Sequence, residues 1–208
     1  MVNKLHKGDN PEREEEIISI AQKRFALFGY DKTTMQEIAN DLKISKGSLY
    51  YYFPDKEHLY KTIILKEQEV FIESLNIKLN NTDNPDIMLI DYVKTRLELF
   101  RNLINLNRSR MEDFRGIHSI IKETLNSLNL QEKEVVKEIL RKGNEKKIYS
   151  ISDIDEIAGL FLDLLKGLRM TQIKEMSIYY IDEKEYELLV NRSVLFVKLV
   201  LKGIETKK

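Results

Sequence analysis

One stretch of thirteen residues, 44–56, constrains this chain more than any other part of it. It reads ISKGSLYYYFPDK and contains three consecutive tyrosines. Adjacent residues of a helix point in different directions, so a core helix could not bury all three phenol groups. Some of these rings must therefore face solvent or a binding partner.

A short helix is predicted directly before this stretch, over residues 33–42. Thr34 and Glu37 have the spacing of a capping box, and Ile38 and Leu42 give the helix an apolar side. Two short helices joined by a tight turn, the second carrying hydroxyl and cationic groups, are typical of a helix-turn-helix that reads DNA.

The remaining sequence also predicts helices, and no segment shows the alternation of a strand. Asn10 and Pro11 mark the start of the first helix, and Gly29 marks its end. The buried stripe of this helix is predicted from helical spacing to contain Ile17, Ala21, Phe25 and Phe28.

A fourth helix is predicted from Pro54 to about Leu79, followed by a linker over residues 80–85. Asp182 and Glu185 have the spacing of another capping box. Further helices are predicted at roughly 86–106, 108–128, 131–147, 153–178 and 183–204. The expected fold class is all-α, with a three-helix N-terminal domain and a larger helical bundle, about nine helices in total. We place the two domains at residues 1–54 and 55–208.

Composition limits the kind of protein this can be. The 208 residues include no cysteine, which excludes disulfides, thiolate catalysis and thiolate metal sites. The 34 basic and 34 acidic residues balance, which argues against a nonspecific nucleic-acid coat. No apolar run is long enough to span a bilayer, and the chain opens on polar residues unlike a signal peptide. We therefore expect a cytoplasmic protein without membrane contact.

Catalysis finds little support in the sequence. His6, His58 and His118 are scattered without metal-ligand spacing, and no glycine loop suited to phosphate is present. Acidic runs such as 14–16 are typical of solvated helix faces. We expect no catalytic residue, no metal site and no cofactor.

The region from Ile17 to Leu59 resembles the DNA-binding domain of the TetR family of bacterial transcriptional regulators. The resemblance is carried, in order and spacing, by Phe28-Gly29-Tyr30, Thr33-Thr34, Ile38-Ala39, residues 44–53 and Lys56-Glu57-x-Leu59. It implies three N-terminal helices, six or so C-terminal helices, dimerisation through the last two, and a ligand cavity inside the second domain.

Lys43 departs from the family pattern, because the turn between the two short helices usually holds glycine. A positive φ at a non-glycine residue costs about 1 kcal/mol. Either the turn is rearranged, or Lys43 offsets this cost by contacting a DNA phosphate.

The recognition helix is expected to begin near Ser45 and to present its N-terminal side to the major groove. Lys46 would donate to guanine, Gln36 would read adenine or meet a phosphate, and Tyr51 would meet a thymine methyl or a sugar. Gly47 would let the DNA backbone approach closely. The hydroxyl, phenol and ammonium groups expected on phosphates are those of Thr34, Ser48, Tyr50, Tyr52 and Lys56. Leu49 and Phe53 are expected to point inward.

The second domain is predicted to hold a small-molecule site, because it mixes aromatic, flexible apolar and a few polar residues. Arg96 could meet an anionic ligand or pair with a nearby glutamate. Methionine suits a deformable pocket and an ordinary core equally. The candidate ligand-binding residues are Phe71, Tyr92, Arg96, Phe100, Met111, Phe114, His118, Met170 and Ile173.

The last two predicted helices carry apolar stripes wider than one internal neighbour usually needs. The stripes fit either an ordinary core or a homodimer face in which two helices of each chain form a four-helix bundle. The candidate dimer residues are Leu160, Phe161, Leu164, Leu168, Leu189, Phe196, Leu199 and Val200.

The expected function is that of a homodimeric, ligand-responsive repressor. It would leave a palindromic double-stranded DNA operator when a small molecule binds the second domain. The alternative keeps DNA binding but makes the second domain a protein-docking module. A fully packed interior would favour docking, whereas an open cavity would favour sensing.

Overall fold

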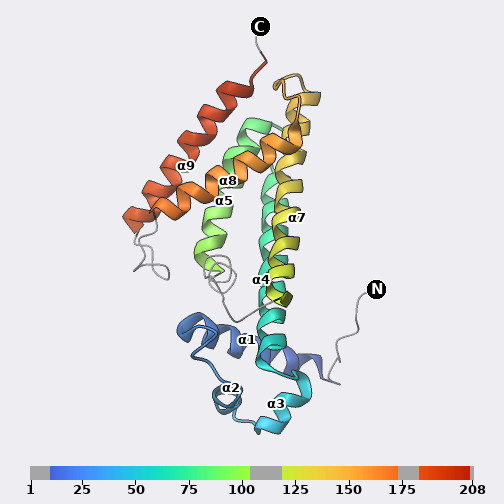
Figure 1. Ribbon diagram of the computed structural model, residues 1–208. Helices are drawn as coiled ribbons and strands as arrows, with labels where there is room; N and C mark the ends of the chain where they lie inside the picture. The colour runs from blue at the N-terminus through green and yellow to red at the C-terminus, as the bar shows by residue number, and fades with distance from the viewer. Residues whose placement is uncertain (1–9, 104–118, 173–182, 207–208) are drawn as a thin grey trace. The chain divides into compact units, whose positions relative to one another are not determined.

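The computed structural model of the protein describes residues 10–103, 119–172 and 183–206, and within these ranges every extended element is a helix. The described part contains eight helices where about nine were expected for the whole chain. In Figure 1 they are α1 (Pro11–Phe28), α2 (Met35–Asp41), α3 (Lys46–Tyr52), α4 (Lys56–Leu79), α5 (Pro85–Asn102), α7 (Ser119–Glu145), α8 (Ile154–Gln172) and α9 (Glu183–Ile204). The all-α prediction is confirmed, and the capping box expected at Asp182 lies outside the described residues.

The chain divides into two compact units. Of the described residues, the first comprises 10–68 and 119–125, and the second comprises 69–103, 126–172 and 183–206. This division falls inside α4, which continues without a break from Lys56 to Leu79. The boundary proposed from the sequence, between residues 54 and 55, falls just before α4 begins and stays a proposal.

The first helix begins and ends where its sequence predicts. The Asn10 side chain accepts a hydrogen bond from the Arg13 N–H at 3.2 Å, and Pro11 follows in the first turn. At the other end Gly29 adopts φ 82°, and its N–H donates to the Phe25 carbonyl at 2.8 Å. Both helix ends are therefore satisfied by their own flanking residues.

The predicted buried stripe of α1 is wrong at one position. Ile17, Ala21 and Phe25 are fully buried, but Phe28 is 53% exposed. Periodicity gives the direction of a side chain, not whether another element covers it at the last residue of a helix. The Phe28 ring instead packs against the Arg24 guanidinium, which lies 5.1 Å from the ring centroid.

The turn after α2 keeps the conformation that usually requires glycine. Lys43 has φ 54°, its N–H donates to Asn40, and the Ile44 N–H reaches back to Ala39 at 3.0 Å. This pair of hydrogen bonds is the Schellman motif, which caps the last carbonyls of a helix. The turn is therefore not rearranged. The left-handed backbone at Lys43 lowers the stability of the fold relative to glycine at this position.

The same arrangement recurs at the end of α7. Lys147 has φ 58°, its N–H donates to Asn144 at 2.9 Å, and the Ile148 N–H donates to Gly143 at 2.9 Å. Lys43 and Lys147 are both exposed. The chain thus places a lysine in two matched left-handed positions, one in each unit.

The second unit is a helical bundle whose core lies largely along α5. The linker after α4 ends at Asn84, whose side chain accepts from the Asp86 and Ile87 amides, and Pro85 opens α5. In Figure 1, α9 lies beside both α5 and α8, and it makes close contacts with both. Among the described residues, no helix combines the length and apolar character needed to cross a bilayer.

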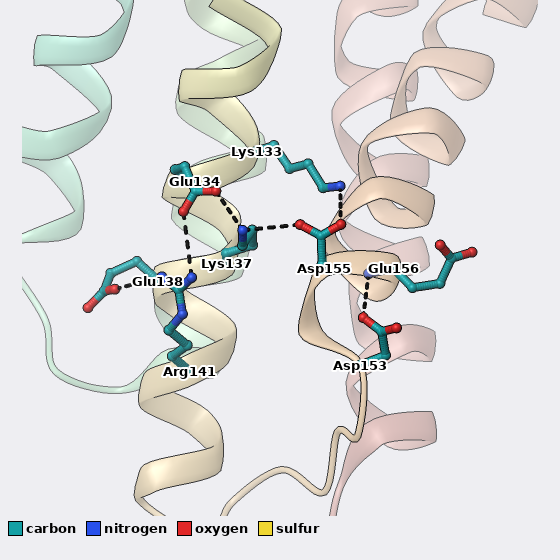
Figure 2. Close-up of polar contacts among 8 residues, drawn as sticks. All are labelled: Lys133, Glu134, Lys137, Glu138, Arg141, Asp153, Asp155 and Glu156. Atoms are coloured by element: carbon teal, nitrogen blue, oxygen red, sulfur yellow. Dashed lines mark hydrogen bonds and ion pairs between the residues drawn. The ribbon is translucent and has the colours of Figure 1, made fainter.

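A network of ion pairs ties α7 to the first turn of α8, as Figure 2 shows. Lys133 and Lys137 reach Asp155 at 2.7 and 3.1 Å. On α7 itself, Glu134 pairs with Lys137 and Arg141. Exposed pairs of this kind contribute about 0–1 kcal/mol each, so the network orients the two helices more than it stabilises them.

Replacing either left-handed lysine by asparagine, which tolerates this conformation, should stabilise the protein slightly. We expect Lys43→Asn and Lys147→Asn each to raise the free energy of unfolding by about 0.5–1 kcal/mol, measured by urea denaturation. The two variants control for each other, because both relieve the same backbone. A loss of stability in both would contradict the assigned turn geometry.

Candidate nucleic-acid interface

The helix α3 begins where the sequence predicts a recognition helix. Ser45 is its N-cap: the Ser45 hydroxyl oxygen accepts from the Ser48 N–H at 3.0 Å, and the two hydroxyls are 2.8 Å apart. Leu49 is fully buried and Phe53 is 5% exposed, so both point inward as expected. These two side chains anchor one side of the helix and turn its other side outward.

The outward side of α3 carries the groups expected to meet DNA. Tyr50 and Tyr51 are 42% and 62% exposed, which confirms that this run of tyrosines faces out of the core. The Tyr51 and Tyr52 rings meet edge to face with centroids 5.2 Å apart, and Tyr52 is half-buried. The Lys46 ammonium lies 5.6 Å from the Tyr50 ring centroid. The exposed Lys46 ammonium at the start of α3 therefore lies against the Tyr50 ring.

Gly47 is not required by packing inside the protein. A Cβ built at this position would meet only the Ser45 hydroxyl oxygen, at 3.7 Å, which is an ordinary contact. Gly47 lies in the first turn of α3 and is exposed. The bare backbone at this point is thus open to whatever binds the outer face.

The polar side chains of α2 are already engaged within the protein. The Thr34 hydroxyl donates to the Glu37 carboxylate at 2.8 Å and accepts from the Glu37 N–H at 3.2 Å. The Gln36 amide donates to the Asn40 side chain at 2.9 Å. Thr34 would have to exchange its bond to Glu37 for one to a phosphate, whereas Gln36 keeps a second amide hydrogen available.

Arg24 is a contributor that the sequence analysis missed. Its guanidinium pairs with Glu37 at 2.9 Å and with Asp41 at 2.6 Å, which joins α1 to both ends of α2. The pKa of Glu37 is held below its ordinary value, first by the Thr34 hydroxyl and then by Arg24. Arg24 neutralises two acids beside the predicted DNA face. No local spacing could reveal this, because the partners lie far apart in the sequence.

Lys56 makes internal contacts that its predicted phosphate role did not anticipate. Its ammonium donates to the backbone carbonyls of Tyr30 at 2.9 Å and Thr33 at 3.0 Å, and it lies 4.0 Å from the Tyr30 ring centroid. Burial lowers the pKa of Lys56 below its ordinary value. Two of its three donors thus hold the start of α4 to the loop before α2. The phosphate contact stays a prediction.

The comparisons with known proteins agree with this geometry. Residues 17–63 match the family described as "Bacterial regulatory proteins, tetR family". The crystal structure of a transcriptional regulator from Cytophaga hutchinsonii ATCC 33406 is 39% identical, with a TM-score of 0.78, over 93% of this chain and 99% of that chain. The chain belongs to the TetR family.

Two curated relatives of this TetR-family chain are matched over different lengths. YuxN of Bacillus subtilis (strain 168), an HTH-type transcriptional regulator, is 40% identical over 94 residues, which cover 45% of this chain and 31% of YuxN. QacR of Staphylococcus aureus (strain Mu50 / ATCC 700699), also an HTH-type transcriptional regulator, is 26% identical over 157 residues, which cover 74% of this chain and 82% of QacR. The chain thus spans under a third of YuxN and most of QacR.

Four of the candidate ligand-binding residues lie together inside the second unit of this TetR-family chain. Phe71, Tyr92, Arg96 and Phe100 are all buried, and the Phe71 and Phe100 ring centroids are 5.5 Å apart. Arg96 forms an ion pair with Glu132, so the glutamate partner suggested by the sequence is present. Met111, Phe114, His118 and Ile173 lie outside the described residues.

Met170 does not belong with the buried candidates. It is 49% exposed, whereas its neighbour Arg169 is 2% exposed and lies 4.3 Å from the Phe100 ring centroid. Phe161, Leu165 and Arg169 form the buried side of α8 at a spacing of four residues, and Met170 points a further 100° around the helix. The ligand-binding role of Met170 stays a prediction, and Arg169 is a buried residue of α8 that the sequence analysis missed.

The candidate dimer residues separate into three groups, buried, half-buried and exposed. Phe161 and Leu189 are 3% and 2% exposed within a single protomer, and their place in a dimer face stays a prediction. The Phe161 ring packs toward Tyr92, with centroids 6.2 Å apart. Leu168, Phe196 and Val200 are half-buried. Large apolar side chains remain exposed along α8 and α9 at Leu160, Leu164, Leu188, Leu195 and Leu199.

Gly47→Ala should separate folding from DNA binding. Alanine favours a helix over glycine and meets no clash here, so the melting temperature should stay the same or rise. The added methyl group should obstruct DNA and weaken binding about tenfold or more, in a titration at fixed salt. Gly203→Ala in α9, where a Cβ would also meet nothing, is the matched control and should leave DNA affinity unchanged. Unchanged DNA affinity in Gly47→Ala would exclude close approach at this glycine.

Lys56→Met should show which of two roles the ammonium has. If Lys56 acts by holding the Tyr30 and Thr33 carbonyls, DNA affinity falls while the slope of log affinity against log salt stays unchanged. If it contacts a phosphate, the slope falls by about 1. The internal contacts lead us to expect an unchanged slope, with loosened amide hydrogen exchange over residues 30–34. Lys46→Met, which removes an exposed cation, is the comparison and should lower the slope.

Proposed function

We propose that this TetR-family chain is a sequence-specific, ligand-responsive transcriptional repressor that binds operator DNA as a homodimer. The observation that carries the proposal is the recognition helix α3, buried through Leu49 and exposing Lys46, Gly47 and Tyr51. TetR-family regulators are usually ligand-responsive repressors, and a regulator of this kind would work on cytoplasmic DNA. The relatives named above are transcriptional regulators, which supports a non-enzymatic role.

The exposed groups of α3 divide naturally between base reading and backbone binding. Lys46, at the start of the helix, is placed to donate to guanine in the major groove, and Tyr51 to contact a thymine methyl or a sugar. Phosphate contacts set the register of the protein on the duplex. We assign them to Thr34, Lys43, Ser48, Tyr50 and Tyr52, with Gln36 reading adenine or a phosphate and Ser45 capping the helix, whereas Lys56 acts through the loop before α2.

Dimerisation through α8 and α9 explains the exposed leucines of those helices. Burial stabilises association by about 25 cal/mol per Å² of apolar area, so a row of exposed leucines favours a covered face. An isologous pair of helices from each protomer would form a four-helix bundle. The resulting two-fold symmetry requires a palindromic operator, with recognition helices roughly 34 Å apart.

Effector control would act through α4, because this one continuous helix belongs to both compact units. A ligand in the second unit would shift α4, and Lys56 in its first turn would carry that shift to the loop before α2. A coupling free energy of about 1–3 kcal/mol is typical of such systems and would change operator occupancy. Phe71, Tyr92, Arg96 and Phe100 are the described side chains that we assign to the ligand site.

Protection mapping of the DNA upstream of its own gene tests this proposal. We expect a protected palindrome whose half-sites are centred about one helical turn apart. Leu164→Glu, which places a charge on the proposed dimer face, should give a monomer by sedimentation and lose the protected site.

The matched control is Leu130→Glu, because Leu130 is 67% exposed and belongs to α7, not to the two helices of the proposed dimer face. It should stay dimeric and keep full protection. Absence of any protected site for the wild-type protein would argue against an autoregulatory operator, and a dimeric Leu164→Glu variant would reject the assigned face.

A further inference from the structure

The second unit buries three charged side chains around one aromatic ring. Arg96 on α5, Glu132 on α7 and Arg169 on α8 are 2%, 1% and 2% exposed. The two guanidinium groups lie 4.5 Å and 4.3 Å from the centroid of the same ring, Phe100. Ionised groups are rarely buried so completely, and those that are need partners for their hydrogen-bonding atoms.

The hydrogen bonds of Arg96 leave one part of its guanidinium unused. Its Nε donates to Glu132 Oε1 at 2.5 Å, and the same oxygen accepts from the Tyr92 hydroxyl at 2.8 Å. Arg96 Nη1 is buried and has no hydrogen-bond partner. A buried donor left unpaired costs about 1–3 kcal/mol, and more when it is charged. The ion pair with Glu132 therefore accounts for only part of this side chain.

Arg169 brings a second positive charge to the same ring. Arg169 also makes other contacts, so we assign it no vacant hydrogen-bond donor. Its role in the site is to place a positive charge beside Phe100. Like charges repel strongly where the dielectric is low, so this site favours an anion close to both arginines. A neutral acceptor would satisfy Arg96 Nη1 but would gain nothing from Arg169. A carboxylate would gain from both, because guanidinium and carboxylate groups form charge-assisted hydrogen bonds.

Aromatic side chains surround this charged group. The Phe71 ring centroid lies 5.5 Å from that of Phe100, and Tyr92 lies 6.2 Å from Phe161. Ligand sites of this kind combine an apolar lining with a few polar groups that fix the orientation of the ligand. The apolar part of a ligand would thus have rings to contact on the α4 and α5 sides of Arg96.

We propose that the effector is an amphiphilic carboxylate, whose head group accepts a hydrogen bond from Arg96 Nη1 beside Arg169 and whose apolar part packs against Phe71 and Phe100. This inference rests on the proposed function, since it names the class of molecule that the regulator senses. It assigns Arg96 two roles: Nε holds Glu132, and Nη1 reads the ligand.

The probes that test this are octanoate and octanamide, which share one tail and differ in the charge of the head group. Titrated calorimetrically into the full-length protein without DNA, octanoate should bind about tenfold tighter than octanamide. Arg96→Lys keeps a positive charge for Glu132 but removes the second nitrogen, Nη1. It should reduce that preference severalfold, because Arg169 still favours the charged head group.

Arg101→Lys is the matched control, because Arg101 also lies on α5 but forms an exposed ion pair with Glu183 at 2.7 Å. It should keep the preference for octanoate. Equal binding of the two probes to the wild-type protein, or failure of octanoate to bind, would overturn the inference. So would a folded Arg96→Lys variant, checked by circular dichroism, that keeps the full wild-type preference for octanoate.

Two further measurements keep the outcomes separate. If Arg96→Lys does not fold, Arg169→Met replaces it and should reduce the preference for octanoate by removing the second positive charge beside the head group; an unchanged preference would overturn the inference. Because the titrations contain no DNA, failure of the wild-type protein to protect operator DNA would count against the proposed function alone.

Discussion

Two helices of only seven residues each form the helix-turn-helix, and so short a helix is not stable by itself in water. Caps at the helix ends and anchoring in the core offset this low intrinsic stability of α2 and α3. The capping box of Thr34 and Glu37 closes one end of α2, and the Schellman turn at Lys43 closes the other. Ser45 caps α3, and Leu49 anchors it in the core. These caps satisfy part of the backbone at the helix ends without using the exposed face of α3, which is left to carry polar groups outward.

Charged side chains make the long-range connections in both units. In the first unit, Arg24 joins α1 to Glu37 and Asp41 of α2, while Lys56 joins α4 to the loop after α1. In the second unit, Arg96 and Glu132 join α5 to α7 in a fully buried pair. Breaking one member of such a pair leaves an uncompensated charge, so these contacts specify how the helices pack.

Local signals predicted the elements well and the surroundings of single residues less well. The N-cap at Asn10, the capping box at Thr34, the recognition helix at Ser45 and the glycine at Gly29 all follow from interactions between near neighbours in the chain. The error at Phe28 concerns burial, and burial is also what the sequence left open at Met170, which is exposed, and at Phe161 and Leu189, which are buried. Burial depends on which element covers a side chain, and helical periodicity carries no information on that.

The sequence by itself determined that the chain is helical, where its short helices begin, and which face of α3 carries lysine and tyrosine, because caps, spacing and composition act within a few residues. Only the tertiary structure decided the partners of its charges. Lys56 meets Tyr30 and Thr33, and Arg169 meets Phe100, across 23 residues or more of sequence. Such contacts arise when the chain folds back on itself, and electrostatics at close range then selects which charges remain paired.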